Sequence, residues 1–349
     1  MTKNVINTYA AYCKENEIRL ASSSGAVFSL LSNHVLKQQG VVYGVAMTDD
    51  CKAAEYVRID SQDELYRLRG SKYMQAKVEN TYIQVQKDLK DGKKVLFSGT
   101  GCQINGLKFF LGKEYANLLC ADIVCHGVPS PLLWKKYVED LEKKTNANLV
   151  SVNFRSKDKG WQDFGMKELN SEHKEIYTSK NLNPYMQMFL KNYCLRPSCY
   201  ACIAKDKKMS DMTIGDFWGI DSVVPEMNDG KGVSLVIIRT IKGSEMFEDV
   251  KKDLYFKEVE YSESVRWNPS EYCSVKRPNE RDKFFLDMHA MTFEELEKQY
   301  VAIKPSLKFI IKKMIKGVIM MTPMKNLIYR SYTRNNHANY GMIFVLKNK

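Results

Sequence analysis

The sequence predicts a mixed α/β fold with a largely parallel sheet, followed by a cysteine-bearing α+β domain and a basic helical tail. Buried strands alternate with helical patterns in the first part, strand patterns of an antiparallel type follow, and basic residues gather at the end. With 349 residues the chain is long enough for two ordinary domains. We expect a polar lead-in over 1–20, an α/β domain over 20–150, an α+β domain over 151–290 and the tail over 291–349.

The elements of the first domain follow from apolar spacing. A helix is predicted after Ser23-Ser24-Gly25 up to Gly40, and the run 41–47 is typical of a strand. Strand, turn and helix alternate at this spacing, which favours parallel strands, whose ligands gather at their carboxyl ends. The remaining predictions are helices at 58–68, 78–89, 104–111 and 131–145 and strands at 94–98 and 118–124.

The second domain has a different pattern. Segments 150–155 and 168–177 predict strands of an antiparallel sheet. A helix ending near Tyr193, a cysteine-rich loop and an apolar strand at 233–240 follow.

The basic charge is concentrated in the tail. The formal net charge is +12, but residues 301–349 contain eight lysines, two arginines and no acidic residue, so the rest carries only +2. Because phosphate binding needs clustered cations, we expect no nucleic-acid partner. Segment 306–321 predicts a basic amphipathic helix suited to an anionic membrane surface or an acidic partner. An ordinary packed helix with a lysine face is the alternative.

The cellular compartment bears on the nine cysteines. No signal peptide and no membrane span is recognisable, so we expect a cytoplasmic protein that is able to bind peripherally at the inner face of the membrane. In a reducing compartment, clustered cysteines more often indicate metal binding or catalysis than disulfides.

The clearest local motif is C-x4-C-x2-C, formed by Cys194, Cys199 and Cys202. Its spacing matches part of an iron–sulfur loop and also half of a structural zinc site. No second cysteine knuckle is present, which favours a cluster completed from a distance. Cys102 and Cys125 each follow a predicted buried strand and are the candidates, although buried thiols are also common in such cores.

Further segments suit an anionic aromatic cofactor. The glycine turn at 98–103 offers N–H groups to an anion, but it matches neither a dinucleotide fingerprint nor a P-loop. Segment 70–75 places a lysine, a tyrosine ring and an amide together, or is simply a helix cap with an exposed lysine. His126 is a candidate proton donor or a structural hydrogen-bonding residue. Asp216 and Trp218 form either a cofactor wall or a packed turn.

Together these motifs resemble the coenzyme F420 hydrogenase/dehydrogenase beta-subunit family. The likeness spans about residues 20–240 and rests on the stretches SSSGAVFSLL, GVVYGVA, LRGSKYMQA, VLFSGTGCQINGLKFFL, NLLCADIVCHGVPSP, NFRSKDKGW, LRPSCYACIAKDKKMSDMTIGDFWGID and NDGKGVSLVII. Members are flavoproteins with iron–sulfur clusters that transfer electrons between FAD, clusters and a partner. Some reduce F420, some reduce chlorophyll or bilin-type pigments, and many bacterial members belong to polysaccharide biosynthesis with unknown substrates.

The resemblance implies site residues. It favours as [4Fe–4S] ligands the four cysteines Cys102, Cys125, Cys199 and Cys202. The expected FAD site consists of Ser23, Ser24, Gly25, Gly70, Ser71, Lys72, Tyr73, Gln75, Gly99, Thr100, Gln103 and His126. Lys72 and His126 are the candidate catalytic residues.

Three departures from the family pattern matter. Cys13 is the only cysteine before Cys51, so the usual ferredoxin segment is expected to be absent. Either a separate ferredoxin is then the donor, or the chain is a shortened or degenerate member of the family. The family's GTPCQ is GTGCQ in this chain, and its SSSGG is SSSGA, which could loosen the cofactor turns.

The sequence therefore predicts an iron–sulfur flavoprotein oxidoreductase. Electrons would pass from a donor such as ferredoxin through a [4Fe–4S] cluster and FAD to an organic acceptor, either F420-like or a polysaccharide-pathway intermediate. The alternative is an accessory protein of membrane-associated polysaccharide biosynthesis. Such a protein would either transfer electrons without acting on a substrate, or have no redox activity and use a zinc ion to stabilise its fold.

Overall fold

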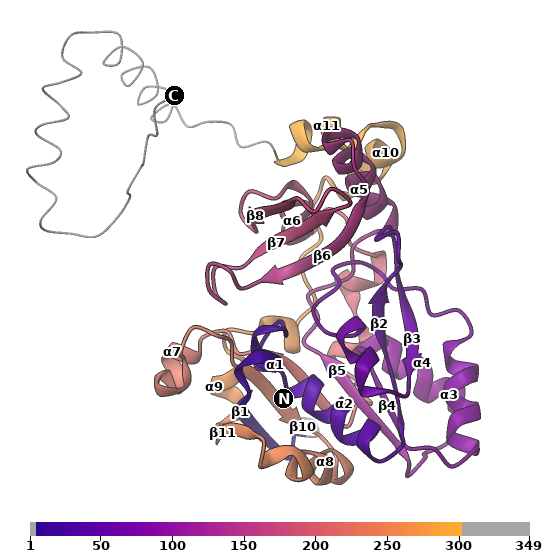
Figure 1. Cartoon of the computed structure of the whole chain (residues 1–349), viewed down its shortest axis with the longest axis vertical. Coiled ribbons are helices and arrows are strands. Elements are labelled where there is room, and N and C mark those ends of the chain that lie inside the picture. Colours follow the sequence, from indigo (N-terminus) through magenta and orange to yellow (C-terminus); the bar gives the residue numbers. More distant parts are fainter. Residues whose placement is uncertain (1–4, 302–349) are drawn as a thin grey trace, which may run out of the picture. The chain divides into compact units, whose positions relative to one another are not determined.

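The computed structural model describes residues 5–301, which form two β-sheets and the helices around them (Figure 1). The large sheet has eight strands in the order β11-β1-β10-β9-β5-β4-β2-β3, and the small sheet has the order β6-β7-β8. The mixed α/β class is confirmed. The predicted basic helix at 306–321 lies outside the described residues.

Both sheets are built from short strands. The strands of the large sheet are β1 (Asn7–Cys13), β2 (Val41–Met47), β3 (Ala54–Ile59), β4 (Val95–Thr100), β5 (Leu118–Ile123), β9 (Met212–Asp216), β10 (Ser234–Ile238) and β11 (Leu254–Glu258). Those of the small sheet are β6 (Leu149–Ser156), β7 (Gly165–Asn170) and β8 (Glu175–Ser179). The α-helices are α1 (Asn16–Leu20), α2 (Val27–Lys37), α3 (Thr81–Lys90), α4 (Gly101–Leu111), α5 (Pro131–Thr145), α6 (Pro184–Leu190), α7 (Ile220–Val223), α8 (Ile241–Lys251), α9 (Tyr261–Val265), α10 (Arg281–Ala290) and α11 (Phe293–Leu296).

The large sheet is parallel in its middle and antiparallel at both margins. Strands β2, β4, β5 and β9 form the parallel block, while β3 on one side and β10, β1 and β11 on the other pair antiparallel. Both faces are covered. Tyr43 packs in a core with α3 and α4, whereas its neighbour Val42 packs in a second core with α2 and α8. Such two-sided burial is expected of parallel strands.

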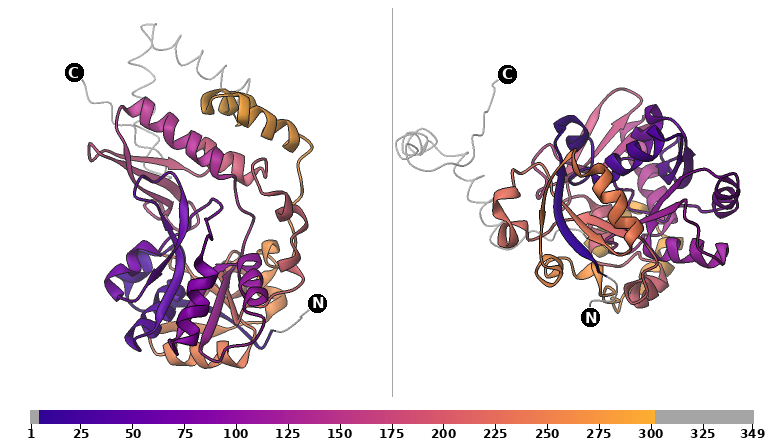
Figure 2. Two further views of the ribbon diagram at one scale, coloured as in Figure 1. Left: turned by 90° about the vertical axis from the view of Figure 1, so that its right-hand side faces the viewer. Right: turned by 90° about the horizontal axis from the view of Figure 1, so that it is seen from below.

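The small sheet is antiparallel, as its sequence pattern predicted. Its inner face packs on α5 and α6 through an aromatic cluster, in which Trp134 lies 4.8 Å from Phe154 and 4.9 Å from Tyr185 between ring centroids. Helix α11 joins this core where Phe293 contacts Tyr137. Figure 2 shows α5 and α10 running together at this end of the described body.

Three local predictions need correction. The helix expected at 58–68 is shorter than predicted and of another type: Arg58 and Ile59 belong to β3, which pairs with β2, and a 3₁₀ helix spans Gln62–Arg67. The strand expected at 168–177 is a hairpin of β7 and β8. The first twenty residues, expected as a lead-in, contribute β1, which pairs with β10 and β11. A domain boundary near residue 150 stays a prediction, and the large sheet takes strands from both sides of it.

Membrane crossing has no support in the described helices. Within residues 5–301, none combines the length and the apolar character needed to cross a bilayer.

Candidate functional site

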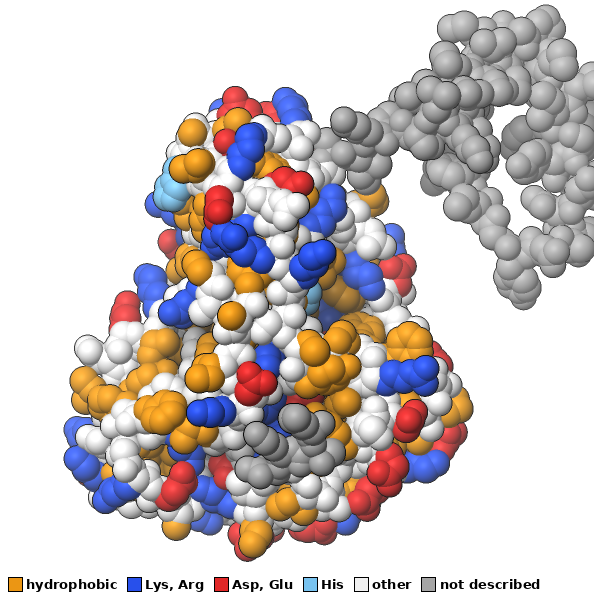
Figure 3. All heavy atoms as spheres, turned by 180° about the vertical axis from the view of Figure 1, so that it is seen from behind, with side chains coloured by type: hydrophobic (Ala, Val, Ile, Leu, Met, Phe, Trp, Pro, Cys, Tyr) orange, Lys and Arg blue, Asp and Glu red, His pale blue; other side chains and the backbone are white. Residues whose placement is uncertain are grey.

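A cavity of about 650 Å³ lies where the carboxyl ends of the parallel strands face the small sheet and α6. Its walls come from the loop before α2, the segments after β4, β5 and β9, and residues of the small-sheet side. In Figure 3 hydrophobic and basic side chains gather around the narrowing between the two parts of the described body. The cavity is lined by these predicted cofactor residues: Ser23, Ser24, Gly70, Ser71, Lys72, Tyr73, Gly99, Thr100, Gln103 and His126.

Two predicted cofactor residues lie outside the cavity lining. Gly25 is pressed against β1 and β10, because a Cβ there would lie 2.3 Å from the carbonyl oxygen of Ala11 and 2.8 Å from the amide of Ser234. The amide of Gln75 donates to the carbonyl of Pro129 at 3.1 Å. Both positions shape the backbone around the cavity.

The two serine segments predicted to hold the cofactor contact each other directly. The hydroxyls of Ser23 and Ser71 lie 3.0 Å apart, and the amide of Ser71 donates to Ser23 Oγ at 2.9 Å. Gly70 precedes this contact with φ +81°, a conformation that favours glycine. The loop before α2 and the segment after the 3₁₀ turn therefore form one polar wall.

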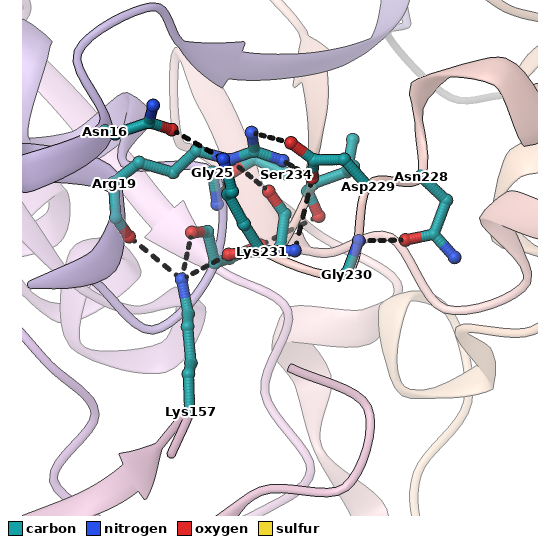
Figure 4. Close-up of polar contacts among 12 residues, drawn as sticks. Asn16, Arg19, Gly25, Lys157, Asn228, Asp229, Gly230, Lys231 and Ser234 are labelled. Carbon is teal, nitrogen blue, oxygen red and sulfur yellow. Dashed lines mark hydrogen bonds and ion pairs between the residues drawn. The ribbon is translucent and has the colours of Figure 1, made fainter. Parts of the chain in front are cut away.

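A half-buried lysine directly after strand β6 of the small sheet holds this wall from behind. The ammonium group of Lys157 donates to the carbonyl oxygens of Arg19, Ser24 and Lys231 at 2.9, 2.7 and 2.8 Å (Figure 4). Arg19 pairs with Asp229 through two hydrogen bonds of 2.8 and 2.6 Å. The loop that carries Ser24 is thus fixed to the loop at 228–232.

The glycine turn after β4 begins helix α4 with a capping box. Gln103 Oε1 accepts from the Thr100 amide at 3.0 Å, and Tyr56 OH donates to the same oxygen at 3.0 Å. A Cβ at Gly99 would lie 1.9 Å from Tyr56 OH. These hydrogen bonds fix the end of β4 and the start of α4, where Gly99 and Thr100 line the cavity.

Lys72 places an amine at the cavity wall. Its Nζ donates to the carbonyls of Arg67 and Arg69 at 3.0 and 2.7 Å. Burial lowers the pKa of Lys72 to about 7. An arriving phosphate would favour the charged amine, so this group suits an anionic cofactor.

The four cysteines predicted as ligands belong to three separate segments of the chain. Burial raises the pKa of Cys125 to about 12, the charge of Lys205 lowers it, and thiolates at Cys102 and Cys199 would raise it further. Burial also raises the pKa of Cys199, and charges on Cys102 and Cys202 add to this. The backbone supports the same proximity, since a Cβ at Gly127 would lie 3.4 Å from Cys199 Cβ.

Exposure separates these four cysteines from the buried ones. Cys102 is exposed and Cys125, Cys199 and Cys202 are partly exposed, whereas Cys194 is fully buried. Cys13, Cys51 and Cys120 are buried too, as expected of plain core thiols. Cys273 is exposed.

The four thiols are tested as metal ligands by their chemistry alone. Within residues 5–301, no three cysteine, histidine or carboxylate side chains are grouped as a metal ion requires. Four cysteine thiolates are the usual ligands of an iron–sulfur cluster, so the four residues fit such a cluster by donor type.

His126 lies beside this group and faces the cavity. Burial lowers its pKa, so the ring is neutral near pH 7. Its Nε2 lies 2.6 Å from Asn192 Oδ1, which assigns the proton to Nε2 and leaves Nδ1 as an acceptor. Phe189 packs edge-on against the ring at 5.2 Å between centroids.

The sequence reasoning missed the part of the cavity contributed by the small sheet. Arg155, Phe164 and Lys180 line it, and Arg155 forms an ion pair with Asp216 at 2.9 Å. The turn at Asp216 and Trp218 was recognised as a candidate wall. Its arginine partner carried no local signal, because an arginine inside a strand pattern is ordinarily read as solvent-exposed.

Comparisons with known proteins concern most of the chain. Residues 8–81 match the family model for the N-terminal part of the coenzyme F420 hydrogenase/dehydrogenase beta subunit, and residues 92–264 match the model for its C-terminal part. No curated protein matches the sequence. A solved structure, the xenon-derivatised F420-reducing [NiFe] hydrogenase complex from Methanosarcina barkeri, contains a chain with 14% identity and a TM-score of 0.49, covering 73% of this chain and 82% of that chain.

Proposed function

Because this chain belongs to the coenzyme F420 hydrogenase/dehydrogenase beta-subunit family, we propose that it moves electrons from a donor such as ferredoxin to an organic acceptor, using a bound [4Fe–4S] cluster and FAD. Membership makes it an oxidoreductase-type redox protein. What we propose beyond this is which cofactors the chain binds and which donor and acceptor it uses.

One observation carries the proposal: Cys125, which is one of the four predicted ligands, lines the cavity. A cluster held by Cys102, Cys125, Cys199 and Cys202 would therefore border the cavity. Bound there, the cluster would supply single-electron transfer and the flavin would convert it into two-electron chemistry.

The chain's own residues have defined tasks in this proposal. Ser23, Ser71 and Lys72 would hold the anionic part of FAD, with the hydroxyl pair as donors and the amine as the cation. The glycine at position 99, where β4 ends at the cavity wall, would allow close approach of the cofactor to the backbone. His126 would hold or move a proton at Nδ1, and burial of its ring keeps it neutral for that task.

The donor, the acceptor and the location extend the proposal. We propose a separate ferredoxin-like donor, and an acceptor that is either F420-like or an intermediate of a polysaccharide pathway. We also propose a cytoplasmic location, and peripheral binding at the inner face of the membrane would rest on the basic segment 306–321.

The test is an anaerobic visible spectrum of the purified chain, with iron, sulfide, zinc and flavin analysis. We expect flavin bands at about 370 and 450 nm above a broad iron–sulfur shoulder that bleaches with dithionite. A colourless protein containing zinc would contradict the proposal and support the accessory-protein alternative. If the protein is coloured but reduces no acceptor in a panel that includes F420, its proposed role would be restricted to electron transfer.

A further inference from the structure

The segment that follows the C-x4-C-x2-C motif packs along helix α4. A Cβ at Gly101 would lie 3.2 Å from the Cβ of Ala204, so the two backbones approach closely at the start of the helix. The side-chain amide of Asn105 donates to the carbonyl oxygen of Lys207 at 2.6 Å. The first turn of α4, in which Cys102 is exposed, therefore adjoins this segment at the protein surface.

A second segment, 272–277, is bound to both ends of the cysteine motif. The amide of Cys202 donates to Ser274 Oγ at 2.9 Å. The side-chain amide of Asn192 donates to the carbonyl oxygen of Lys276 at 3.3 Å. Two segments that lie far apart in the sequence thus meet around the predicted cluster ligands.

These two segments are strongly basic. Segment 191–208 has five basic residues and one acidic residue, and segment 272–277 has two basic residues and no acidic one, so together they carry +6. Residues 1–300 as a whole carry only +2, which leaves −4 for the rest of that range. The positive charge of the main body is therefore concentrated beside the predicted ligands. We call segments 191–208 and 272–277 together the basic patch.

Most cations of the basic patch have no partner that would explain them. Lys208 is the exception, since its ammonium group pairs with Asp122 and Glu271 at 3.1 and 2.9 Å. Four other basic side chains are exposed and form no ion pair within residues 5–301: Lys191, Arg196, Lys207 and Lys276. Internal ion pairs do not account for these four cations, which face solvent and can pair with carboxylates of another molecule.

Apolar side chains are exposed next to these cations. Ile203 directly follows Cys202 and is 61% exposed, and Tyr272 directly precedes the exposed Cys273 and is 45% exposed. Protein interfaces combine such apolar and aromatic side chains with a polar or charged rim. The basic patch therefore has the composition of a protein-binding surface.

The charge outside the basic patch disfavours an extended polyanion as its ligand. A nucleic-acid duplex or a membrane presents negative charge over a wide area, so it would also meet the net negative remainder of residues 1–300. A compact acidic protein can contact the patch alone. The uneven charge would also steer such a protein toward the patch during the encounter.

We propose that the basic patch is the docking surface for an acidic partner protein, the electron donor of the proposed function. Its exposed cations would pair with carboxylates around the donor's redox centre, and Ile203 and Tyr272 would form the apolar contact. One electron would then leave the donor's reduced centre and enter this chain beside Cys102 and Cys202. The donor role rests on the proposed function, whereas binding of an acidic protein is independent of it.

The test measures the dissociation constant of a small acidic plant-type ferredoxin for the full chain, by biolayer interferometry. We expect K207E/K276E to raise this constant about tenfold at low salt, because each substitution replaces an attraction by a repulsion. Raising the salt from about 50 to about 500 mM should weaken binding to wild type by a similar factor. A basic c-type cytochrome of similar size should bind much more weakly than the ferredoxin.

Two control variants change the net charge by the same amount at other places. K37E/K143E alters exposed lysines of α2 and α5, and K312E/K316E alters the basic segment 306–321. Both should leave the dissociation constant within about twofold of wild type, because the altered charges lie outside the patch. An equal loss of affinity in all three double variants would show an effect of net charge alone and would overturn the proposal.

Two further results separate the partner class and the donor role. Binding of a DNA duplex or of anionic vesicles that is tighter than ferredoxin binding, and that K207E/K276E weakens equally, would overturn the assignment to a protein partner. Iron and flavin analysis of the same samples tests the proposed function separately. If the chain lacks both cofactors but still binds ferredoxin through Lys207 and Lys276, the docking surface is supported and only the donor role is lost.

Discussion

Lys157 Nζ donates a hydrogen bond of 2.7 Å to the main-chain oxygen of Ser24, 133 residues earlier in the chain. The same ammonium group also binds the carbonyls of Arg19 and Lys231. The turn that follows strand β6 therefore sets the position of a loop on the large-sheet side, and that loop carries the serine wall of the cavity.

Replacing this lysine should weaken cofactor binding without touching the cysteines. We expect K157M to raise the dissociation constant of FAD about tenfold, because three carbonyl groups lose their shared donor and the Ser24 loop loosens. Quenching of FAD fluorescence measures this. K159M is the matched control, since Lys159 lies in the same turn and packs over the Tyr177 ring. Equal FAD affinity in K157M and wild type would contradict the assigned positioning role.

The close packing of Gly232 against Lys157 and Ser24 predicts how substitutions in the loop at 228–232 change the free energy of unfolding. A Cβ at Gly232 (φ +105°) would lie 2.9 Å from the Ser24 oxygen and 3.0 Å from Lys157 Nζ. Gly230 has φ +77° and open space around its position. G230A should therefore cost about 1 kcal/mol from backbone strain alone, and G232A about 2–3 kcal/mol, because it adds a clash. Urea denaturation of both variants measures the difference, and equal losses would show that the close approach is unimportant.

The cysteine assignment predicts which thiols carry iron. C102S, C125S, C199S and C202S should each lose most of the bound iron and the associated absorption. C194A is the matched control, because Cys194 is fully buried and burial raises its pKa strongly, as in an inert core thiol. It should retain iron and lose about 1–2 kcal/mol of stability. Iron loss in C194A, with retention in C102S, would favour the local three-cysteine motif instead.

The amine of Lys72 predicts how FAD binding depends on pH. Because its pKa is lowered to about 7, the free protein loses this charge as pH rises from about 6 to about 8.5. FAD should bind about tenfold more weakly at the upper end, since binding of the phosphates then requires uptake of a proton. K72R should bind independently of pH over this range, and K72M weakly throughout. The control K77M alters an exposed lysine of the same segment and should keep the wild-type dependence of FAD affinity on pH. If FAD affinity of wild type does not change with pH, a role for Lys72 in phosphate binding is ruled out.

The sequence was most informative where chemistry and regular periodicity coincide. The strands that end before Cys102 and Cys125 were predicted within two residues of their bounds, because a short apolar run between turns allows few alternatives. The sequence placed Ser23 and Ser71 in the same cofactor site but did not predict that they contact each other. Its direct hydrogen bond depends on how two loops meet, and no local pattern contains that information.

The missed features share one physical cause. Strand β1 spans seven residues, but its buried alanines carry little apolar signal, so tertiary pairing rather than composition makes it a strand. Arg155 and Lys157 lie close together in the sequence, yet one faces the cavity and the other the carbonyls behind the serine wall. Buried cations are recognisable only from their partners, and these lie 61 and 133 residues away.

The pair Glu168 and Tyr137 predicts an unusual loss of stability as pH rises through neutrality. Glu168 is 1% exposed, accepts from Tyr137 OH at 2.5 Å, and burial raises its pKa to about 7 from 4.5. Below pH 4.5 both folded and unfolded chains hold this proton. Between pH 4.5 and 7 only the folded chain holds it, so the contribution to stability falls across this range and stays low above it.

Wild type should therefore lose about 2 kcal/mol from this group between about pH 5 and pH 8, relative to E168Q, which cannot ionise there. Urea denaturation at both pH values measures the difference. E172Q is the control, because Glu172 is exposed in the hairpin after the same strand and should follow the wild-type profile. If the stability of E168Q and of wild type responds equally to pH, the folded chain holds Glu168 ionised throughout this range. A compensating group must then lie near its second carboxylate oxygen, which has no hydrogen-bond partner among the described residues.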